Sequence, residues 1–267
     1  MLGICYDTET TGLPDYKNPS EGPQQPHIVE LAAKVVNLDT MAVVDFFSCL
    51  IKPAGWTWDE NDEAYQAHGI TFEQAMDEGI PEPDALAQFL AMHNSAVDLR
   101  IGHNEAFDQR ILRIAMKRYG DGLDGWETYS QERKDEIADA FKARPSYCTC
   151  NSAKPILKLP PTPKMIATGK KHWFKTPNLD EAHQHFTGRP HVDAHRAMPD
   201  VDACLRVYFG LNPPARPLYA GLFELDKPRG EDGVHDQAAQ ASAGAEVVVD
   251  GIQSGADRTT SGAIGQP

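Results

Sequence analysis

The apolar segments at the start of the chain constrain its fold more than any other feature. Residues 3–9, 28–38 and 42–51 are rich in apolar, β-branched and aromatic side chains, which predicts three β-strands before the first long helix. The short link at Asp39–Thr40 indicates that the second and third strands form an antiparallel meander.

Helical and strand patterns then alternate along the chain. We expect helices at 83–95, 130–142 and 178–187, a strand at 98–103, a helix capped by Asn104, and a last helix that starts at Pro199. This order predicts a mixed sheet with helices packed on it, a fold of the α/β class.

The end of the chain differs in composition from the rest of its 267 residues. No aromatic residue follows Phe223, and Gly, Ala, Ser, Asp and Gln dominate. Such a segment buries too little apolar surface to offset its ordering entropy, so residues 225–267 are expected to be a disordered tail. The tail is either an appendage without a role or a tether to a partner.

The charge balance excludes one class of protein. Asp and Glu number 39 against 25 Lys and Arg, which gives a formal net charge of −14. A simple basic protein that coats phosphates is therefore excluded. The charge balance does not exclude an enzyme that binds nucleic acid through a local basic patch or through metal ions.

The cysteines and the apolar runs bear on location. Five cysteines at scattered positions form no disulfide framework, which indicates a reducing compartment, and we expect the cytoplasm. No apolar run is long enough for a membrane span, and the segment MLGICYDTET lacks the basic start of a secretory signal.

Two acids mark the end of the first expected strand. Asp7 and Glu9 stand two positions apart, so both carboxylates project from one face of the strand. Neighbouring carboxylates repel unless a cation or a proton lies between them, and Mg²⁺ prefers oxygen ligands of this kind. Alone, such a pair is common and is more often a solvated strand end.

Three further residues could reach the same place. Asp108 lies in or near the first turn of the helix after Asn104, and Asp200 lies in the first turn of the last helix. His195 falls in the loop just before that helix, where a histidine beside a metal-bound acid can act as a general base. Each residue alone also fits a helix-start acid or a surface histidine.

Taken together and in this order, the segments DTETTGL, HNEAFD and HRAMPD resemble the motifs of the DEDDh 3′→5′ exonucleases. This family includes the proofreading (epsilon) subunit of DNA polymerase III, ribonuclease T and oligoribonuclease. The resemblance covers about residues 1–210 and includes EAYQAHGIT at 63–71 and IVELA at 28–32. It implies a ribonuclease H-like fold with a mixed five-stranded sheet, an exonuclease domain at 1–211 and a linker and tail at 212–267.

The resemblance also assigns roles to residues. Asp7, Glu9, Asp108 and Asp200 would hold two divalent cations, Mg²⁺ or Mn²⁺, with Asp7, Glu9 and His195 as the catalytic residues and His195 as the general base. The expected substrate contacts are Thr10, Gly12, Leu13, Glu63, His68, His103, Asn104 and Phe107 within or beside these motifs, and Lys170 and Lys171 in the basic segment described next.

A basic segment supports a nucleic-acid substrate. Between Lys142 and Lys175 the chain has eight Lys or Arg and no acid, and Trp173 and Phe174 lie within this stretch. Cations for phosphates and aromatics for bases suit a single strand, so we expect a loop-rich substrate arm at about 142–177. A solvated basic loop remains the alternative.

The sequence therefore predicts a metal-dependent 3′→5′ exonuclease of single-stranded DNA ends, of the proofreading or repair type, that releases nucleoside monophosphates. Trimming of RNA ends is the second hypothesis, since the motifs are shared. The third is a non-catalytic nucleic-acid-binding scaffold. A DNA polymerase is a conceivable partner, and no membrane partner is expected.

Overall fold

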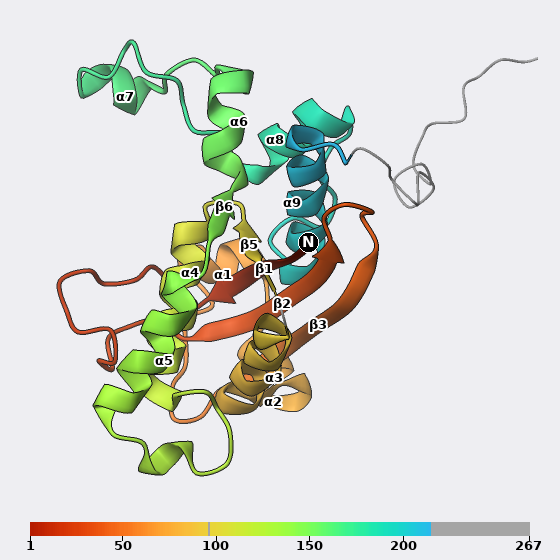
Figure 1. Cartoon of the computed structure of the whole chain (residues 1–267). Coiled ribbons are helices and arrows are strands. Elements are labelled where there is room, and N and C mark those ends of the chain that lie inside the picture. The colour runs from red at the N-terminus through yellow and green to blue at the C-terminus, as the bar shows by residue number, and fades with distance from the viewer. Residues whose placement is uncertain (96, 215–267) are drawn as a thin grey trace, which may run out of the picture. The chain divides into compact units, whose positions relative to one another are not determined.

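The computed structural model describes residues 1–95 and 97–214. Its centre is a six-stranded mixed sheet in the order β4-β3-β2-β1-β5-β6 (Figure 1). The strands are β1 Leu2–Thr10, β2 Ile28–Asn37, β3 Val43–Lys52, β4 Ile80–Pro81, β5 Leu99–Gly102 and β6 Ser146–Cys148.

The expected meander and mixed sheet are confirmed. β1 pairs antiparallel with β2, β2 pairs antiparallel with β3, and β5 joins β1 on its other side in parallel. The sheet has six strands rather than five. The additional strand is β4, which pairs with β3 through two residues only. A two-residue strand has no alternating pattern that a sequence could reveal.

Helices cover both faces of the sheet. They are α1 Glu63–His68, α2 Phe72–Glu78, α3 Glu82–Asn94, α4 Glu105–Tyr119, α5 Gln131–Ala143, α6 Thr149–Leu157, α7 Pro163–Ala167, α8 Leu179–Thr187 and α9 Ala197–Leu211, with a 3₁₀ turn at Trp126–Thr128. Among the described residues, no helix is long and apolar enough to cross a bilayer.

Alternation along β1 divides the core between the two faces. Ile4 and Tyr6 pack with side chains of α3, α4 and α5 in the larger buried cluster. Cys5 points to the other face and packs with side chains of α9. Because β1 has strands on both sides and helices on both faces, its C-terminal end is held rigidly, and the acids Asp7 and Glu9 lie there.

Three local expectations need correction. Asn104 precedes α4 but adopts a left-handed conformation with φ of 68° and makes no side-chain capping bond. The last helix starts at Ala197 rather than at Pro199, since the first-turn positions have no intrahelical acceptor for their N–H groups and tolerate proline. The basic segment is less loop-like than its prolines indicate, because β6, α6 and α7 lie within it and Pro155 lies inside α6. The expected tail at 225–267 lies outside the described residues.

Candidate active site

The first two acids of the site come from the end of β1. Asp7 and Glu9 are partly buried and lie on the strand face that packs against α9. Glu9 is opposite Glu30 of β2, and the pairing register shifts between Glu9 and Thr10. This irregularity ends the regular ladder, so the chain leaves the sheet directly after the acids.

The third acid comes from the first turn of α4. Asp108 is buried, and its Oδ1 accepts hydrogen bonds from the backbone N–H of Thr8 at 3.0 Å and from the Thr8 hydroxyl at 2.8 Å. Thr8 lies between Asp7 and Glu9, so these bonds fix α4 against the acid-bearing strand end. Gly102 permits the tight turn from β5 into α4, because a Cβ there would meet Glu105 at about 3.1 Å.

The last two residues come from α9 and the loop before it. Asp200 lies in the first turn of α9, and His195 precedes the helix in an exposed loop with a left-handed φ of 66°. Glu9, His195 and Asp200 each offer one ligand atom within 4.8 Å of the others. Asp7 and Asp108 are not members of this group, but their charges act on the same carboxyls.

The electrostatics of the site are those of carboxyls without a compensating cation. Burial raises the pKa of Glu9 to about 8, and the neighbouring charges of Asp200, Glu30 and Asp108 add to this. Burial likewise raises the pKa of Asp108 to about 7 and that of Asp200 to about 6. The pKa of Asp7 is raised well above its usual range, first by burial and then by Asp108, Asp200 and Glu9.

These residues fit divalent cations. Four carboxyls that raise one another's pKa gain from a hard cation with oxygen ligands, which replaces protons as the neutralising charge. Oδ1 of Asp200 is buried and accepts no hydrogen bond from the described residues, although Nε2 of His191 lies 3.3 Å away. The donor set is therefore suited to Mg²⁺ or Mn²⁺, and an exposed histidine stands beside it.

An ion pair that the sequence reasoning missed supports the loop of His195. The Arg196 guanidinium donates to both carboxylate oxygens of buried Glu30, at 3.0 and 2.9 Å, and the Ala197 N–H donates to the same carboxylate at 2.9 Å. Forked contacts of this kind fix orientation as well as position. The signal was present in the IVELA and HRA segments, but a sequence does not tell which distant acid an arginine contacts.

A hollow of about 570 Å³ lies beside the acids. It is lined by most of the expected substrate contacts, namely Thr10, Gly12, Leu13, Glu63, His68 and Phe107. The chain around Gly12 is open, and its φ of 153° disfavours any residue with a Cβ. Leu13 is 81% exposed, and Glu63 is also exposed.

The wall of this hollow contains a buried histidine with one unpaired nitrogen. Nδ1 of His68 accepts a hydrogen bond from the Ile70 N–H at 2.9 Å, so Nε2 carries the proton of the neutral ring. Among the described residues Nε2 has no hydrogen-bond partner, and burial lowers the pKa of His68. In the neutral ring Nε2 is therefore the donor.

The remaining expected contacts lie elsewhere. The ring nitrogens of His103 contact the Thr149 hydroxyl at 2.9 Å and the Pro177 carbonyl at 3.1 Å. His103 thus ties both ends of the α6–α7 segment to the core, and neither nitrogen is free for a nucleotide. Asn104 is exposed and lines a second hollow with His103. Lys170 and Lys171 are exposed after α7, outside the group of acids.

Comparisons with known proteins identify the family of this chain. Residues 4–208 match the model of the RNase_T exonuclease family. A comparison with curated protein sequences finds no match.

Among solved structures, the chain is similar to exonuclease I, with 19% identity and a TM-score of 0.53 over 79% of this chain and 40% of that one. It is also similar to E. coli exonuclease I in complex with a dT13 oligonucleotide, with 17% identity and a TM-score of 0.55 over 80% of this chain and 41% of that one. At these identities the likeness concerns the fold, and the chain spans about 40% of the length of these structures. The family model covers more than half of the chain, and the protein therefore belongs to the RNase_T exonuclease family.

Proposed function

We propose that the protein is a metal-dependent 3′→5′ exonuclease that removes nucleoside monophosphates from the ends of single-stranded DNA. The observation that carries the proposal is the meeting of Glu9, Asp200 and His195 within 4.8 Å, beside Asp7 and Asp108. Family membership supports nuclease chemistry. The complex of E. coli exonuclease I with a dT13 oligonucleotide, a similar fold, favours a single-stranded DNA substrate.

The chain's own residues would divide the work. Asp7, Glu9, Asp108 and Asp200 would hold two divalent cations, which supply charge neutralisation and a more acidic water when bound. His195 would accept the proton of the attacking water at a ring nitrogen, since its loop position is exposed and next to the acids. Arg196 and Glu30 would keep that loop in place.

The hollow beside the acids would take the terminal nucleotide. Phe107 would offer an aromatic face for a base, and Nε2 of His68, buried in the wall and without a partner among the described residues, would donate to a sugar or phosphate oxygen. Glu63, exposed at the same hollow, could accept a hydrogen bond from the terminal hydroxyl. Gly12 would let the backbone approach the nucleotide closely.

The basic segment would guide the strand upstream of its end. Lys164, Lys170 and Lys171 are exposed, Trp173 is 61% exposed, and the Lys170 ammonium lies 5.9 Å from the Trp173 ring. Exposed cations beside an exposed ring suit phosphates and a stacked base. A DNA polymerase partner stays a prediction from the family resemblance.

A double variant tests this arm. Lys170→Ala with Lys171→Ala should weaken binding of a thirty-nucleotide strand and reduce the slope of log affinity against log salt by about 1.4. Lys52→Ala, at an exposed lysine at the end of β3, is the matched control. An unchanged slope in the double variant would mean that the segment is a solvated loop.

The direct test uses a DNA and an RNA strand of one sequence, each labelled at the 5′ end, with Mg²⁺, Mn²⁺ or EDTA. We expect a metal-dependent ladder that shortens from the 3′ end, faster on DNA, and no ladder with the Asp7→Asn variant. Faster shortening of RNA would make RNA trimming the function. No shortening of either strand would refute the proposed activity.

A further inference from the structure

A histidine with a buried side chain, outside the expected motifs, contacts one of the acids of the site. His191 lies in the loop between α8 and α9, four positions before His195, and its side chain is 3% exposed. Its Nε2 lies 3.3 Å from Oδ1 of Asp200. Both atoms are buried and have no hydrogen-bond partner in the described part of the chain, so this approach is a close polar contact rather than a hydrogen bond.

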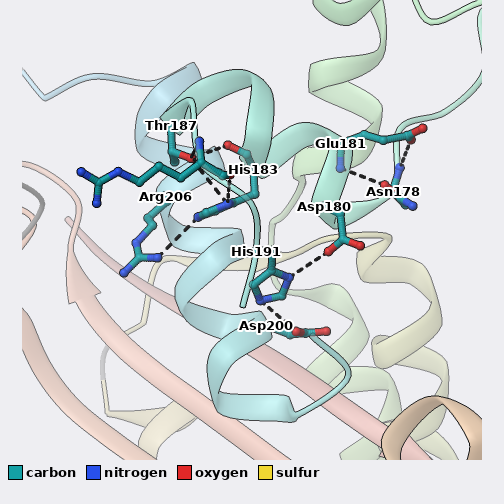
Figure 2. Close-up of polar contacts among 9 residues, drawn as sticks. Asn178, Asp180, Glu181, His183, Thr187, His191, Asp200 and Arg206 are labelled. Carbon is teal, nitrogen blue, oxygen red and sulfur yellow. Dashed lines mark hydrogen bonds and ion pairs between the residues drawn. The ribbon is translucent and has the colours of Figure 1, made fainter. Parts of the chain in front are cut away.

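The other side of the same ring is anchored to α8. Nδ1 of His191 donates to Oδ1 of Asp180, in the first turn of α8, at 3.0 Å. Figure 2 shows the ring standing between Asp180 and Asp200, with one nitrogen directed at each carboxylate. The ring therefore contacts both carboxylates, Asp180 through a hydrogen bond from Nδ1 and Asp200 through Nε2 at 3.3 Å.

A second histidine, His183, supports the position of His191. His183 of α8 packs against the His191 ring with centroids 5.6 Å apart, and its Nδ1 donates to the Arg189 carbonyl at 3.2 Å (Figure 2). Gly188 ends α8 in a left-handed conformation and turns the chain towards this contact. The loop is thus tied to α8 before it reaches His195.

From this geometry we infer that His191 is a positioning residue, which holds the Asp200 carboxylate in the orientation that its metal-binding role requires and is itself oriented by Asp180. The inference rests on the proposed function, because Asp200 is a ligand only if the site binds cations. A residue in polar contact with a ligating carboxylate restricts its rotation, and the loss of such an outer-shell partner usually costs about 10- to 100-fold in metal affinity or activity.

Two conservative variants separate positioning from anchoring. In His191→Gln the amide reaches the place of Nε2, so the contact with Asp200 can persist while that with Asp180 is lost. In His191→Asn the amide takes the place of Nδ1, so the contact with Asp180 can persist while that with Asp200 is lost. His185→Gln changes an exposed histidine of the same helix α8 and serves as the control.

Four quantities are measured for each variant: the Kd for Mn²⁺ without substrate, kcat and KM on a single-stranded oligonucleotide, and the melting temperature in EDTA. We expect His191→Asn to raise the Kd for Mn²⁺ and lower kcat by about tenfold each, with KM within about twofold, since His191 touches no substrate. His191→Gln should retain more affinity and more kcat than His191→Asn. Asp180→Asn should lie between the wild type and His191→Asn.

The outcomes are distinct. If His191→Asn binds Mn²⁺ like the wild type, or if only the melting temperature falls, His191 is a structural residue and the inference is wrong. The same holds if His191→Asn retains more affinity than His191→Gln. If the wild type itself neither binds Mn²⁺ nor cleaves, the proposed function fails instead.

Discussion

Two clusters of buried charge lie next to each other in the molecule and are built in opposite ways. In one, Arg100 is 1% exposed and pairs with Glu105 at 2.9 Å, while the Tyr6 hydroxyl donates to the same carboxylate at 2.6 Å. In the other, Asp7 and Asp108 share a site with Glu9 and Asp200, and the charge of Arg196 offsets only part of the repulsion at Glu9. Neighbouring residues of β1 and one turn of α4 contribute to both clusters.

The difference separates a structural charge from a functional one. The Arg100 guanidinium also lies 4.6 Å from the Phe141 ring centroid and donates to the Arg144 carbonyl at 3.1 Å, so the folded chain itself compensates this charge, although Nε of Arg100 has no hydrogen-bond partner among the described residues. The acids of the other cluster are held together by the fold and kept charged only at a cost, as their raised pKa values show. A bound cation removes that cost, which is the expected signature of a metal site.

The largest effect we predict is on activity. Asp7→Asn should lower kcat/KM on single-stranded DNA by at least about a thousandfold, equal to about 4 kcal/mol of transition-state stabilisation. The melting temperature in EDTA should stay the same or rise, because the change removes one of several repelling charges. An Asp7→Asn protein that folds and still cleaves at the wild-type rate would overturn the assignment.

A matched pair of variants on α4 tests the comparison itself. Glu105→Gln leaves Arg100 buried without its partner and should cost about 3 kcal/mol of unfolding free energy. Asp108→Asn, one turn later on the same helix, should not destabilise the metal-free protein, since Asn Oδ1 can still accept from Thr8. Urea unfolding of both variants in EDTA measures this, and equal losses would show that the two clusters do not differ.

The acid cluster should make metal-free stability fall as the pH rises. Glu9, Asp108 and Asp200 have pKa values of about 8, 7 and 6 when folded, above their ordinary values of 4.5 and 3.8. The folded state therefore keeps protons that the unfolded state has lost, and the stability that they contribute disappears as the pH rises from about 4 to about 8.

Mg²⁺ should restore the stability that the metal-free protein loses as the pH rises. At pH 8 and a concentration a hundredfold above its Kd, it should add about 2.7 kcal/mol, or about 5 °C or more in melting temperature. The gain should be smaller at pH 5, where protons compete for the carboxylates. A gain that does not depend on pH would contradict the explanation.

A histidine of α3 should change the stability with pH by a smaller amount and in the opposite direction. His93 of α3 is buried beside Phe141, and burial lowers its pKa to about 4 from 6.5. As the pH falls, the unfolded state therefore binds a proton at this histidine at a higher pH than the folded state does. The free energy of unfolding should fall by about 1 kcal/mol from pH 6.5 to pH 5.5. His93→Gln should remove this part of the pH dependence, as measured by urea unfolding at the two pH values.

The sequence predicted the elements with long apolar patterns and failed where a contact joins distant parts of the chain. β1, β2 and β3, and the placement of Asp108 and Asp200 in the first turns of their helices, follow from local patterns. The pairing of Arg196 with Glu30 joins residues 166 positions apart, and no local sequence pattern indicates it. His191 and Asp180 were missed for the same reason, since a lone histidine in a loop is unremarkable until the fold places it between two acids.

Binding of Mn²⁺ without substrate tests the central claim most directly, because it asks whether the unpaired acids are a metal site without assuming an activity. Isothermal titration of the wild type, Asp108→Asn and Glu105→Gln at pH 8 compares the two clusters in one experiment. We predict that the wild type and Glu105→Gln bind with similar Kd, and that Asp108→Asn binds at least about tenfold more weakly. Equal binding by the wild type and Asp108→Asn, or no binding by any of the three, would contradict the account.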